Sequence, residues 1–204
     1  MLPEAERFRL RAKQGTPVAG VEIRAVGEDG REVAWDGQGL GELQVRGPWV
    51  AAGYYKDERS AACFEDGWFK TGDIVTIDAE GCIQIADRSK DLIKSGGEWI
   101  SSVDLENQLM AHPKVQEAAV VAIPHPKWQE RPLACVVPRA GQAVTKDELL
   151  DHLRPHVARW ALPDDVVLID AIPKTSVGKF DKKALRARFA DHVLPPPAAE
   201  PPRD

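Results

Sequence analysis

The 204-residue sequence has few cysteines, no long apolar run and no excess of positive charge. Cys63, Cys82 and Cys135 are far apart and show no CxxC spacing, which argues against a zinc site or a disulfide framework. No apolar segment approaches the ~20 residues that a membrane-spanning helix needs. The formal net charge of −5 argues against a general nucleic-acid-binding protein, because such proteins are normally basic. The first 13 residues carry charge where a secretory signal needs an apolar stretch, so we expect a cytoplasmic protein with reduced thiols.

Short β-strands dominate the predicted structure of residues 1–87. Residues 21–26 and 41–47 alternate apolar and polar side chains, which is typical of half-buried strands. Residues 68–88 predict a strand, a turn near Asp78 to Gly81, and a second strand. Helical character is limited to the amino-terminal segment and residues 58–64.

After Arg88 the pattern changes to strands alternating with helices, which indicates a small α+β unit. We expect strands at 118–123, 133–137 and 165–170, and helices at 101–113, 145–153 and 181–190. Thr145 and Glu148 form the T-x-x-E pattern of a capping box at the start of the middle helix. The predicted fold class is therefore α+β, with a β-rich subdomain followed by an α+β domain. Residues 193–204 are rich in proline and are predicted to be a disordered tail.

Lys179 lies behind a glycine in "IPKTSVGKFDKKALR", residues 172–186. This is not a Walker phosphate loop, because Pro173 stands where the first glycine belongs and Phe180 where Ser or Thr belongs. A lysine on a loop of small residues can still bring a positive charge to a phosphate. The alternative is a solvated surface lysine.

Two further stretches are ambiguous when each is taken alone. Asp73 follows Thr-Gly at the predicted entrance of an apolar strand, where it could accept hydrogen bonds from ribose hydroxyls or serve as a turn carboxylate. Residues 86–102 place several charges at the boundary between the two patterns, followed by Gly96-Gly97. That glycine pair permits close approach of a ligand or a tight turn after a charged linker. The histidines form no metal-binding set.

Four motifs together carry a resemblance to a known family. They are "GELQVRGPWVAAGYYKD", "GWFKTGDIV", "ADRSKDLIKSGGEWISS" and "PKTSVGKFDKKALR", in that order. The chain resembles, over about residues 10–190, the carboxy-terminal part of acyl-CoA synthetases of the adenylate-forming superfamily, and most closely the medium- and long-chain fatty-acid CoA ligases. The resemblance implies two steps, carboxylate adenylation by ATP and then thioester formation with CoA and release of AMP. It also implies Mg²⁺ and a small-molecule fatty-acid substrate, with no nucleic-acid partner.

The resemblance assigns roles to the residues singled out above. Lys179 matches the lysine that contacts the α-phosphate and carboxylate oxygens during adenylation, while Asp73 and Arg88 match residues that contact the ribose. Lys90 matches the hinge about which the carboxy-terminal domain rotates. The loop that lines the pantetheine tunnel for CoA is matched by Gly96, Gly97, Glu98 and Trp99. The implied domains are a subdomain at 1–87, a hinge at 88–91 and a carboxy-terminal domain at 91–192.

Nothing in the sequence resembles the family's "SGTTG"-like phosphate loop, its "YGxTE"-like segment that helps hold magnesium, or its acyl pocket. We therefore expect the carboxy-terminal portion of a ligase, inactive alone, from a truncated gene, a misplaced start or a split enzyme with a separate amino-terminal half. The Mg²⁺ ligands would then lie outside this chain. The alternatives are a non-catalytic module that binds a nucleotide or CoA or docks on a partner, and a purely structural α+β domain.

Overall fold

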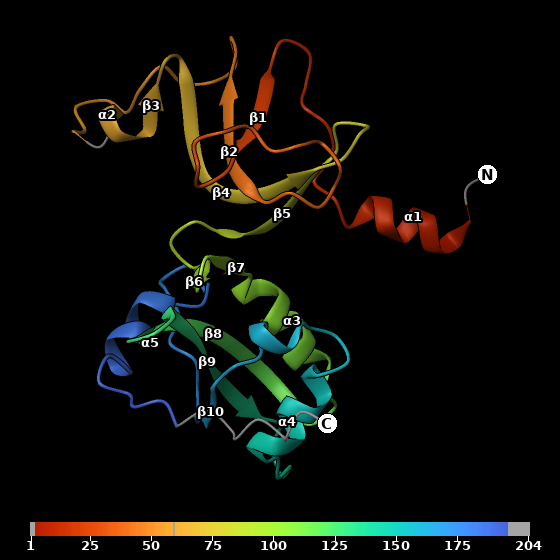
Figure 1. Cartoon of the computed structure of the whole chain (residues 1–204), viewed down its shortest axis with the longest axis vertical. Helices are drawn as coiled ribbons and strands as arrows, with labels where there is room; N and C mark the ends of the chain where they lie inside the picture. The colour runs from red at the N-terminus through yellow and green to blue at the C-terminus, as the bar shows by residue number, and fades with distance from the viewer. Residues whose placement is uncertain (1–2, 59, 196–204) are drawn as a thin grey trace. The chain divides into compact units, whose positions relative to one another are not determined.

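The structure is a computed structural model that describes residues 3–58 and 60–195. The chain divides into two compact units, unit 1 up to Lys90 and unit 2 from Asp91 onward (Figure 1). Residues 196–204 of the predicted disordered tail lie outside the described residues. In the described part, no helix is long and apolar enough to cross a membrane.

Unit 1 is an antiparallel sheet of short strands that curls around a small core. The strands are β1 (Glu22–Val26), β2 (Gly41–Arg46), β3 (Phe64–Glu65), β4 (Trp68–Ile77) and β5 (Ile83–Arg88), in the order β1-β2-β4-β3 with β5 paired to β4. The helices are α1 (Glu4–Arg11) and α2 (Ser60–Cys63). Ala25, Leu43, Val75 and Ile77 form the core. The predicted β-rich character of this part is confirmed.

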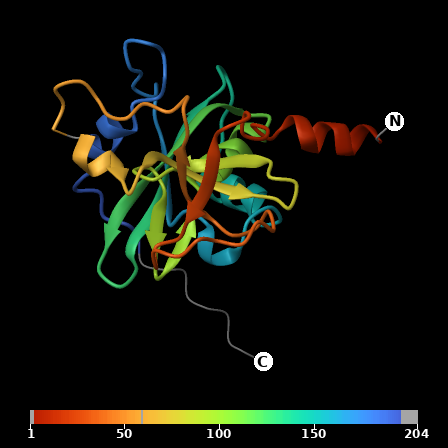
Figure 2. The same cartoon turned by 90° about the horizontal axis from the view of Figure 1, so that it is seen from above.

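Helix α1 extends away from the sheet of unit 1, as Figure 2 shows in red. Phe8 on this helix is 63% exposed. Leu10 on the same helix is 40% exposed, and neither side chain belongs to the core cluster of unit 1.

Strand β4 runs continuously through residue 73, and this corrects the predicted position of Asp73 at a strand entrance. Asp73 lies within β4, not at the entrance of a strand. The Thr71 hydroxyl donates to the Leu43 carbonyl at 3.0 Å and accepts from the Asp73 N–H at 3.1 Å, while Gly72 takes a φ of +73°. The Thr-Gly pair is thus an irregularity inside a continuous strand, because glycine accepts the positive φ at little cost.

Unit 2 is a mixed sheet with helices on both faces. Its strands are β6 (Ile93–Ser95), β7 (Glu98–Ile100), β8 (Val115–His125), β9 (Gln129–Pro138) and β10 (Asp165–Leu168). The order is β10-β9-β6-β7, with β8 paired to β9, and only β10 runs parallel to its neighbour. The helices are α3 (Ser102–Ala111), α4 (Lys146–Leu153), a 3₁₀ turn η1 (Arg159–Ala161) and α5 (Lys182–Arg188).

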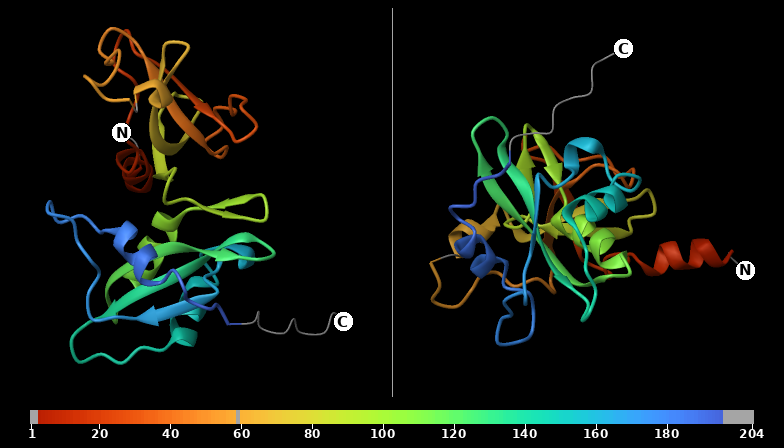
Figure 3. Two further views of the ribbon diagram at one scale, coloured as in Figure 1. Left: turned by 90° about the vertical axis from the view of Figure 1, so that its left-hand side faces the viewer. Right: turned by 90° about the horizontal axis from the view of Figure 1, so that it is seen from below.

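Successive side chains of β8 point alternately into two apolar cores on opposite faces of the sheet. Ala118 and Val120 belong to one apolar cluster, and Ala119 and Val121 to the other. This follows from the two-residue period of side chains in a strand. Helices α3 and α4 supply leucines to the first cluster and α5 supplies Leu185 to the second, so the helices lie on opposite sides of the β8–β9 pair (Figure 3).

The predicted capping box at the start of α4 is confirmed. Thr145 caps α4 by accepting from the Glu148 N–H at 3.2 Å. The Glu148 carboxylate is in turn hydrogen-bonded to the Thr145 backbone, and it also pairs with the Lys114 ammonium at 2.8 Å. The Lys114 ammonium lowers the pKa of Glu148 most, because a charged donor is a stronger partner for a carboxylate than a neutral backbone N–H.

Candidate functional site

Asp73 and Arg88 are direct neighbours on adjacent strands of unit 1. Their Cα atoms are register partners in the β4–β5 ladder, and Arg88 Nε donates to Asp73 Oδ1 at 2.8 Å. The Asp73 side chain is 22% exposed and that of Arg88 57% exposed. The pair therefore presents carboxylate and guanidinium groups side by side at the surface, with capacity for further hydrogen bonds.

Lys90 is the last residue of unit 1 and is exposed. Before it, the Ser89 N–H donates to the Gly72 carbonyl at 2.9 Å. After it, Leu92 and Ile93 are buried in unit 2. The chain is thus anchored on each side of Lys90, and the two units meet in sequence between Lys90 and Asp91.

Gly96 and Gly97 form the turn of a β6–β7 hairpin. Their φ values are +62° and +90°, which suit a two-residue hairpin turn of the primed type. Glu98 and Trp99 follow on β7, where Glu98 is exposed and Trp99 is partly buried. The two short strands were not predicted, whereas the tight turn at the glycine pair was one of the two readings of this stretch.

The hairpin turn packs on Trp128, which sequence reasoning missed. The Gly96 N–H donates to the Trp128 carbonyl at 3.0 Å. A Cβ on Gly96 would come within 2.8 Å of Trp128 Cε3, whereas a Cβ on Gly97 would meet no atom within 4 Å. Gly96 is therefore required both by its φ and by the indole ring against it.

Arg131 holds the base of the hairpin and was also missed. Its guanidinium donates to Ser95 Oγ at 2.9 Å, to the Trp160 and Leu162 carbonyls at 2.7 and 3.0 Å, and to Asp164 Oδ1 at 2.6 Å. The side chain is only 11% exposed. One largely buried arginine side chain thus joins β6 to the segment that carries η1.

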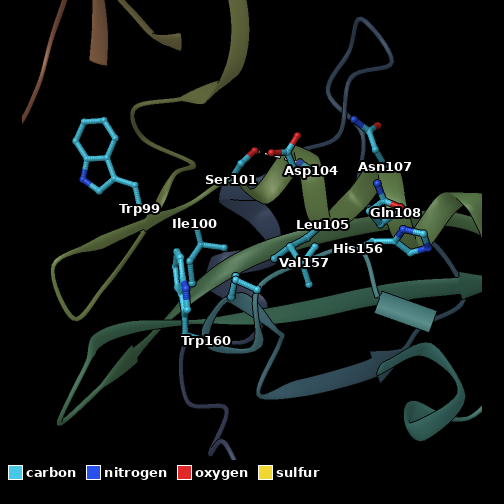
Figure 4. Close-up of a pocket in the computed structure, with 12 residues that line it drawn as sticks. Trp99, Ile100, Ser101, Asp104, Leu105, Asn107, Gln108, His156, Val157 and Trp160 are labelled. Atoms are coloured by element: carbon cyan, nitrogen blue, oxygen red, sulfur yellow. Dashed lines mark hydrogen bonds between the residues drawn. The ribbon is translucent and has the colours of Figure 1, made fainter. Parts of the chain in front are cut away.

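A cleft of about 430 Å³ lies beside this hairpin (Figure 4). Trp99 and Ile100 line it from β7, Ser101 and Asp104 from the start of α3, and Trp160 from η1. Ser101 caps α3 by accepting from the Asp104 N–H at 3.1 Å. The volume lies within the range of small-molecule sites, and polar groups stand among aromatic and aliphatic ones.

Lys179 lies on a closed loop directly before α5. The Thr175 N–H donates to the Lys179 carbonyl at 2.8 Å, and the Lys179 N–H donates to Thr175 Oγ1 at 3.2 Å. Gly178, with a φ of +79°, completes the turn. Lys179 itself is exposed, and no carboxylate among the described residues pairs with its ammonium. Its backbone is held while its side chain remains available.

The described residues contain no group of three or more His, Cys, Asp or Glu side chains that could hold a metal ion. Cys135 is buried, and burial raises the pKa of its thiol to about 12. A thiol with such a pKa is neutral at physiological pH and acts as a core side chain.

Comparison with known proteins identifies the class. Residues 104–179 match the family model described as AMP-binding enzyme C-terminal domain. The fold matches ATP-bound MatB from Rhodopseudomonas palustris with a TM-score of 0.79 and 32% identity, covering 88% of this chain and 36% of that chain. It also matches o-succinylbenzoate CoA synthetase (MenE) from Bacillus subtilis in complex with an acyl-adenylate intermediate, with a TM-score of 0.79 and 32% identity, covering 91% and 37%. Residues 104–179 are therefore an AMP-binding enzyme C-terminal domain, and the chain's structural neighbours are adenylate-forming enzymes.

The curated relatives that match the chain include acyl-CoA ligases. The chain is 57% identical over 194 residues to a long-chain-fatty-acid–CoA ligase of Thermus thermophilus, covering 94% of this chain and 36% of that protein. It is 42% identical over 189 residues to a medium-chain-fatty-acid–CoA ligase of Ectopseudomonas oleovorans, covering 93% and 34%. Its homologues thus include fatty-acid CoA ligases, as the four sequence motifs indicated. The chain spans about a third of the length of these relatives.

The predicted site residues are divided between the two units. Asp73, Arg88 and Lys90 belong to unit 1, and the structure brings the first two into contact. In unit 2 the residues from Gly96 to Trp99 share one hairpin, and Lys179 lies on a separate loop. Their roles in binding and catalysis stay predictions.

Proposed function

We propose that this chain supplies the carboxy-terminal part of an ATP-dependent fatty-acid CoA ligase. The observation that carries the proposal is the 57% identity to a long-chain-fatty-acid–CoA ligase over 94% of the chain. In such a reaction a fatty-acid carboxylate displaces pyrophosphate from ATP to give an acyl-adenylate, and the CoA thiol then displaces AMP.

Lys179 is the proposed catalytic residue of the adenylation step. Negative charge increases on the α-phosphate oxygens as the carboxylate attacks, and a fixed ammonium stabilises that charge. Two observations support this role: the Lys179 backbone is hydrogen-bonded to Thr175, and the side chain is exposed. A lysine held at its backbone loses less conformational entropy when it meets a phosphate.

Asp73 and Arg88 are proposed to hold the ribose of ATP or AMP. A carboxylate has about four lone-pair sites, and Arg88 Nε occupies one of those on Asp73. The partly exposed carboxylate therefore keeps acceptor sites for vicinal hydroxyls, while the guanidinium keeps donors for a neighbouring oxygen. The residues present thus fit a ribose.

The β6–β7 hairpin is proposed to contact the pantetheine arm of CoA. Gly96 and Gly97 present backbone without side chains, and Trp99 lines the adjacent cleft. Glu98 is exposed beside them. Lys90 is proposed as the hinge, which the anchored segments before and after it support. Mg²⁺ would come with the ATP phosphates, since Mg²⁺ in such sites is bound by substrate phosphates together with one or two carboxylates.

The remaining two thirds or so of the relatives' length has no counterpart among these 204 residues. Adenylation requires ATP, metal and carboxylate to be held together, so the chain is proposed to be active only together with a further portion. A non-catalytic module that binds a nucleotide or CoA is the second candidate. The partly exposed Asp73–Arg88 pair supports nucleotide binding in either candidate function.

The test compares the chain alone with a joined ligase, in which the chain is fused to the portion of the Thermus ligase that it does not cover. AMP and acyl-CoA are measured with ATP, Mg²⁺, CoA and a series of fatty acids. We expect no turnover by the chain alone and turnover by the joined ligase. Lys179→Ala should then lower the adenylation rate about 10²- to 10³-fold.

Lys183→Ala is the matched control, because Lys183 is an exposed lysine on α5. It should leave the rate within twofold. An unchanged rate in Lys179→Ala contradicts the catalytic role. A joined ligase that folds but is inactive while the chain still binds AMP favours the non-catalytic module.

A further inference from the structure

Helix α5 begins three residues after Lys179 and is only seven residues long. So short a helix is not stable by itself in water. Its position is therefore set by its contacts with the rest of unit 2. Leu185 packs in the second apolar cluster, and two basic side chains of the helix form ion pairs with residues outside it.

Lys182 forms the first ion pair, with Glu106 of α3. Its ammonium lies 2.7 Å from Glu106 Oε1 and 2.7 Å from Ser102 Oγ. The side chains of Lys182 and Glu106 are 11% and 9% exposed. Glu106 Oε1 also accepts from the Val120 N–H at 2.7 Å. One carboxylate thus joins α3, β8 and α5.

Arg186, one helical turn after Lys182, forms the second ion pair, with Asp91. Its Nη1 donates to Asp91 Oδ1 at 2.8 Å. Residues four apart lie on the same face of a helix, so Lys182 and Arg186 point the same way. Asp91 is the first residue of unit 2, directly after Lys90. Arg186 therefore ties α5 to the point where unit 2 begins.

The loop of residues 173–181, which carries Lys179, is closed by hydrogen bonds between its two ends. The Asp181 N–H donates to the Pro173 carbonyl at 2.8 Å, and Lys174 and Phe180 form a β-bridge. Asp181 also caps α5 by accepting from the Ala184 N–H at 3.0 Å. Both ends of the loop thus meet at the start of α5, and a displacement of α5 moves the whole loop with Lys179.

We propose that Lys182 and Arg186 are positioning residues for Lys179. Through Asp91 and Glu106 they make the Lys179 loop one rigid body with the first residue of unit 2, so that a rotation at Lys90 brings the ammonium to a defined place. This rests on the proposed functions of Lys179 and Lys90. Loss of the Arg186–Asp91 pair lets α5 shift and misplaces the ammonium, without removing any group that touches substrate.

The first stage of the test uses the 204-residue chain and does not depend on its function. Amide hydrogen exchange is measured at Thr175 and Asp181, whose N–H groups close the loop. Arg186→Gln should speed their exchange about tenfold, since local opening governs exchange. The overall unfolding midpoint should hardly move, because a partly exposed ion pair adds little to stability. Lys183→Gln, an exposed change on the same helix, should have no effect.

The second stage uses the joined ligase and separates the two half-reactions. Arg186→Gln should lower kcat for adenylation about 10- to 10²-fold with KM for ATP unchanged, since small misplacements of a catalytic group have effects of this size. Thioester formation from supplied acyl-adenylate should stay within twofold. The charge-swapped double variant Asp91→Arg, Arg186→Asp should recover most of the adenylation rate.

The exchange and half-reaction measurements each have an outcome that overturns the positioning role. Unchanged exchange at Thr175 and Asp181 in Arg186→Gln overturns the proposal at the first stage. Faster exchange with unchanged adenylation overturns the positioning role and leaves only a structural contact. Equal losses in both half-reactions also count against it. If Lys179→Ala keeps full adenylation in the same joined ligase, the function proposed for Lys179 fails, whatever the exchange data show.

Discussion

Arg88 Nε and Asp73 Oδ1 lie 2.8 Å apart, between two residues that face each other in the β4–β5 ladder. The two residues are 15 positions apart in sequence, and only the strand pairing brings them together. Arg88 fixes the orientation of the Asp73 carboxylate. The two proposed ribose contacts are therefore one unit, and a change in either residue affects both.

Asp73→Asn in the joined ligase should weaken AMP binding about 10- to 10²-fold. A hydrogen bond to a charged group contributes roughly 1.5–3 kcal/mol, and the neutral amide replaces one acceptor oxygen by a donor. Isothermal titration with AMP measures the effect. The free energy of unfolding should change by less than about 1 kcal/mol, because the pair is partly exposed.

Asp29→Asn is the control, since Asp29 is an exposed carboxylate in the same unit, 3.9 Å from Arg31. AMP affinity should not respond to it. Equal affinities of the Asp73→Asn and unmodified proteins would contradict a ribose-binding role for Asp73.

Gly96→Ala should destabilise unit 2 more than Gly97→Ala. Both residues have positive φ, so each alanine carries a backbone cost of roughly 1 kcal/mol. Only the Cβ at position 96 meets an atom of Trp128, at 2.8 Å. The indole ring must therefore move, and its fluorescence should change in Gly96→Ala only.

Urea unfolding with fluorescence detection measures both quantities. The double variant Gly96→Ala, Trp128→Ala removes the clash and should bring the cost at position 96 close to that at position 97. If both single variants lose the same stability, the packing of Trp128 on the turn is not what requires glycine.

Much of the fold could be predicted because its strands carry regular side-chain patterns. Residues 21–26 and 41–47 alternate, and the structure has β1 and β2 there. Strands β8 and β9 are longer than their apolar runs, since the paired ends near His125 and Gln129 are polar and stabilised by the ladder.

The hairpin of β6 and β7 was missed for a different reason. Three-residue strands are too short to show a period, so the segment looked like a charged linker. Asp73 was misplaced because a Thr-Gly pair in a sequence is typical of a turn. In the structure Gly72 has a positive φ, yet β4 continues through it. Local pattern cannot distinguish the two cases.

The supporting residues of the candidate site could not be predicted at all. Arg131 bonds to Ser95 and to the Trp160 carbonyl, 36 and 29 positions away, and Lys182 bonds to Ser102, 80 positions away. No spacing in one sequence encodes such contacts, because they depend on how strands and helices pack. Lys179 was singled out from its own loop, but its role in adenylation was suggested only by the resemblance of the four motifs to a family.

Leu109→Ala should cost unit 2 about 2–5 kcal/mol of unfolding free energy. Leu109 is fully buried on α3 against the first apolar cluster, and its truncation leaves a cavity. Met110→Ala on the same helix is the control, because Met110 is 37% exposed and should cost far less.

Segment-resolved hydrogen exchange in urea measures the loss separately in the two units. Protection should fall throughout residues 91–195 and hold in the sheet of unit 1, since each unit has its own core. A simultaneous loss in both units would show that they unfold as one cooperative body.

His112 should make unit 2 less stable as the pH falls below about 6.5, the ordinary pKa of histidine. Burial lowers the pKa of His112, and the neighbouring His152 and Lys114 lower it further, while Glu148 acts in the opposite direction. His112 is 7% exposed, and the centroid of its ring lies 5.0 Å from that of the His152 ring. The folded protein therefore resists protonating His112.

The direction of the change in unfolding free energy with pH follows from proton binding. Below the unfolded pKa the unfolded chain takes up a proton that folded His112 does not, so acid favours unfolding. The contribution is complete above about pH 6.5 and is lost as the pH falls through the lowered pKa of the folded state. One such proton changes the free energy of unfolding by at most about 1.4 kcal/mol per pH unit.

Urea unfolding of the chain between pH 7.5 and about 5 measures this dependence. His112→Gln should reduce the slope of the unfolding free energy against pH by an amount equal to at most one bound proton, because glutamine does not titrate. An identical slope in His112→Gln and the unmodified protein would mean that another group titrates, and His112 would then be only an uncharged packing residue between α3 and α4.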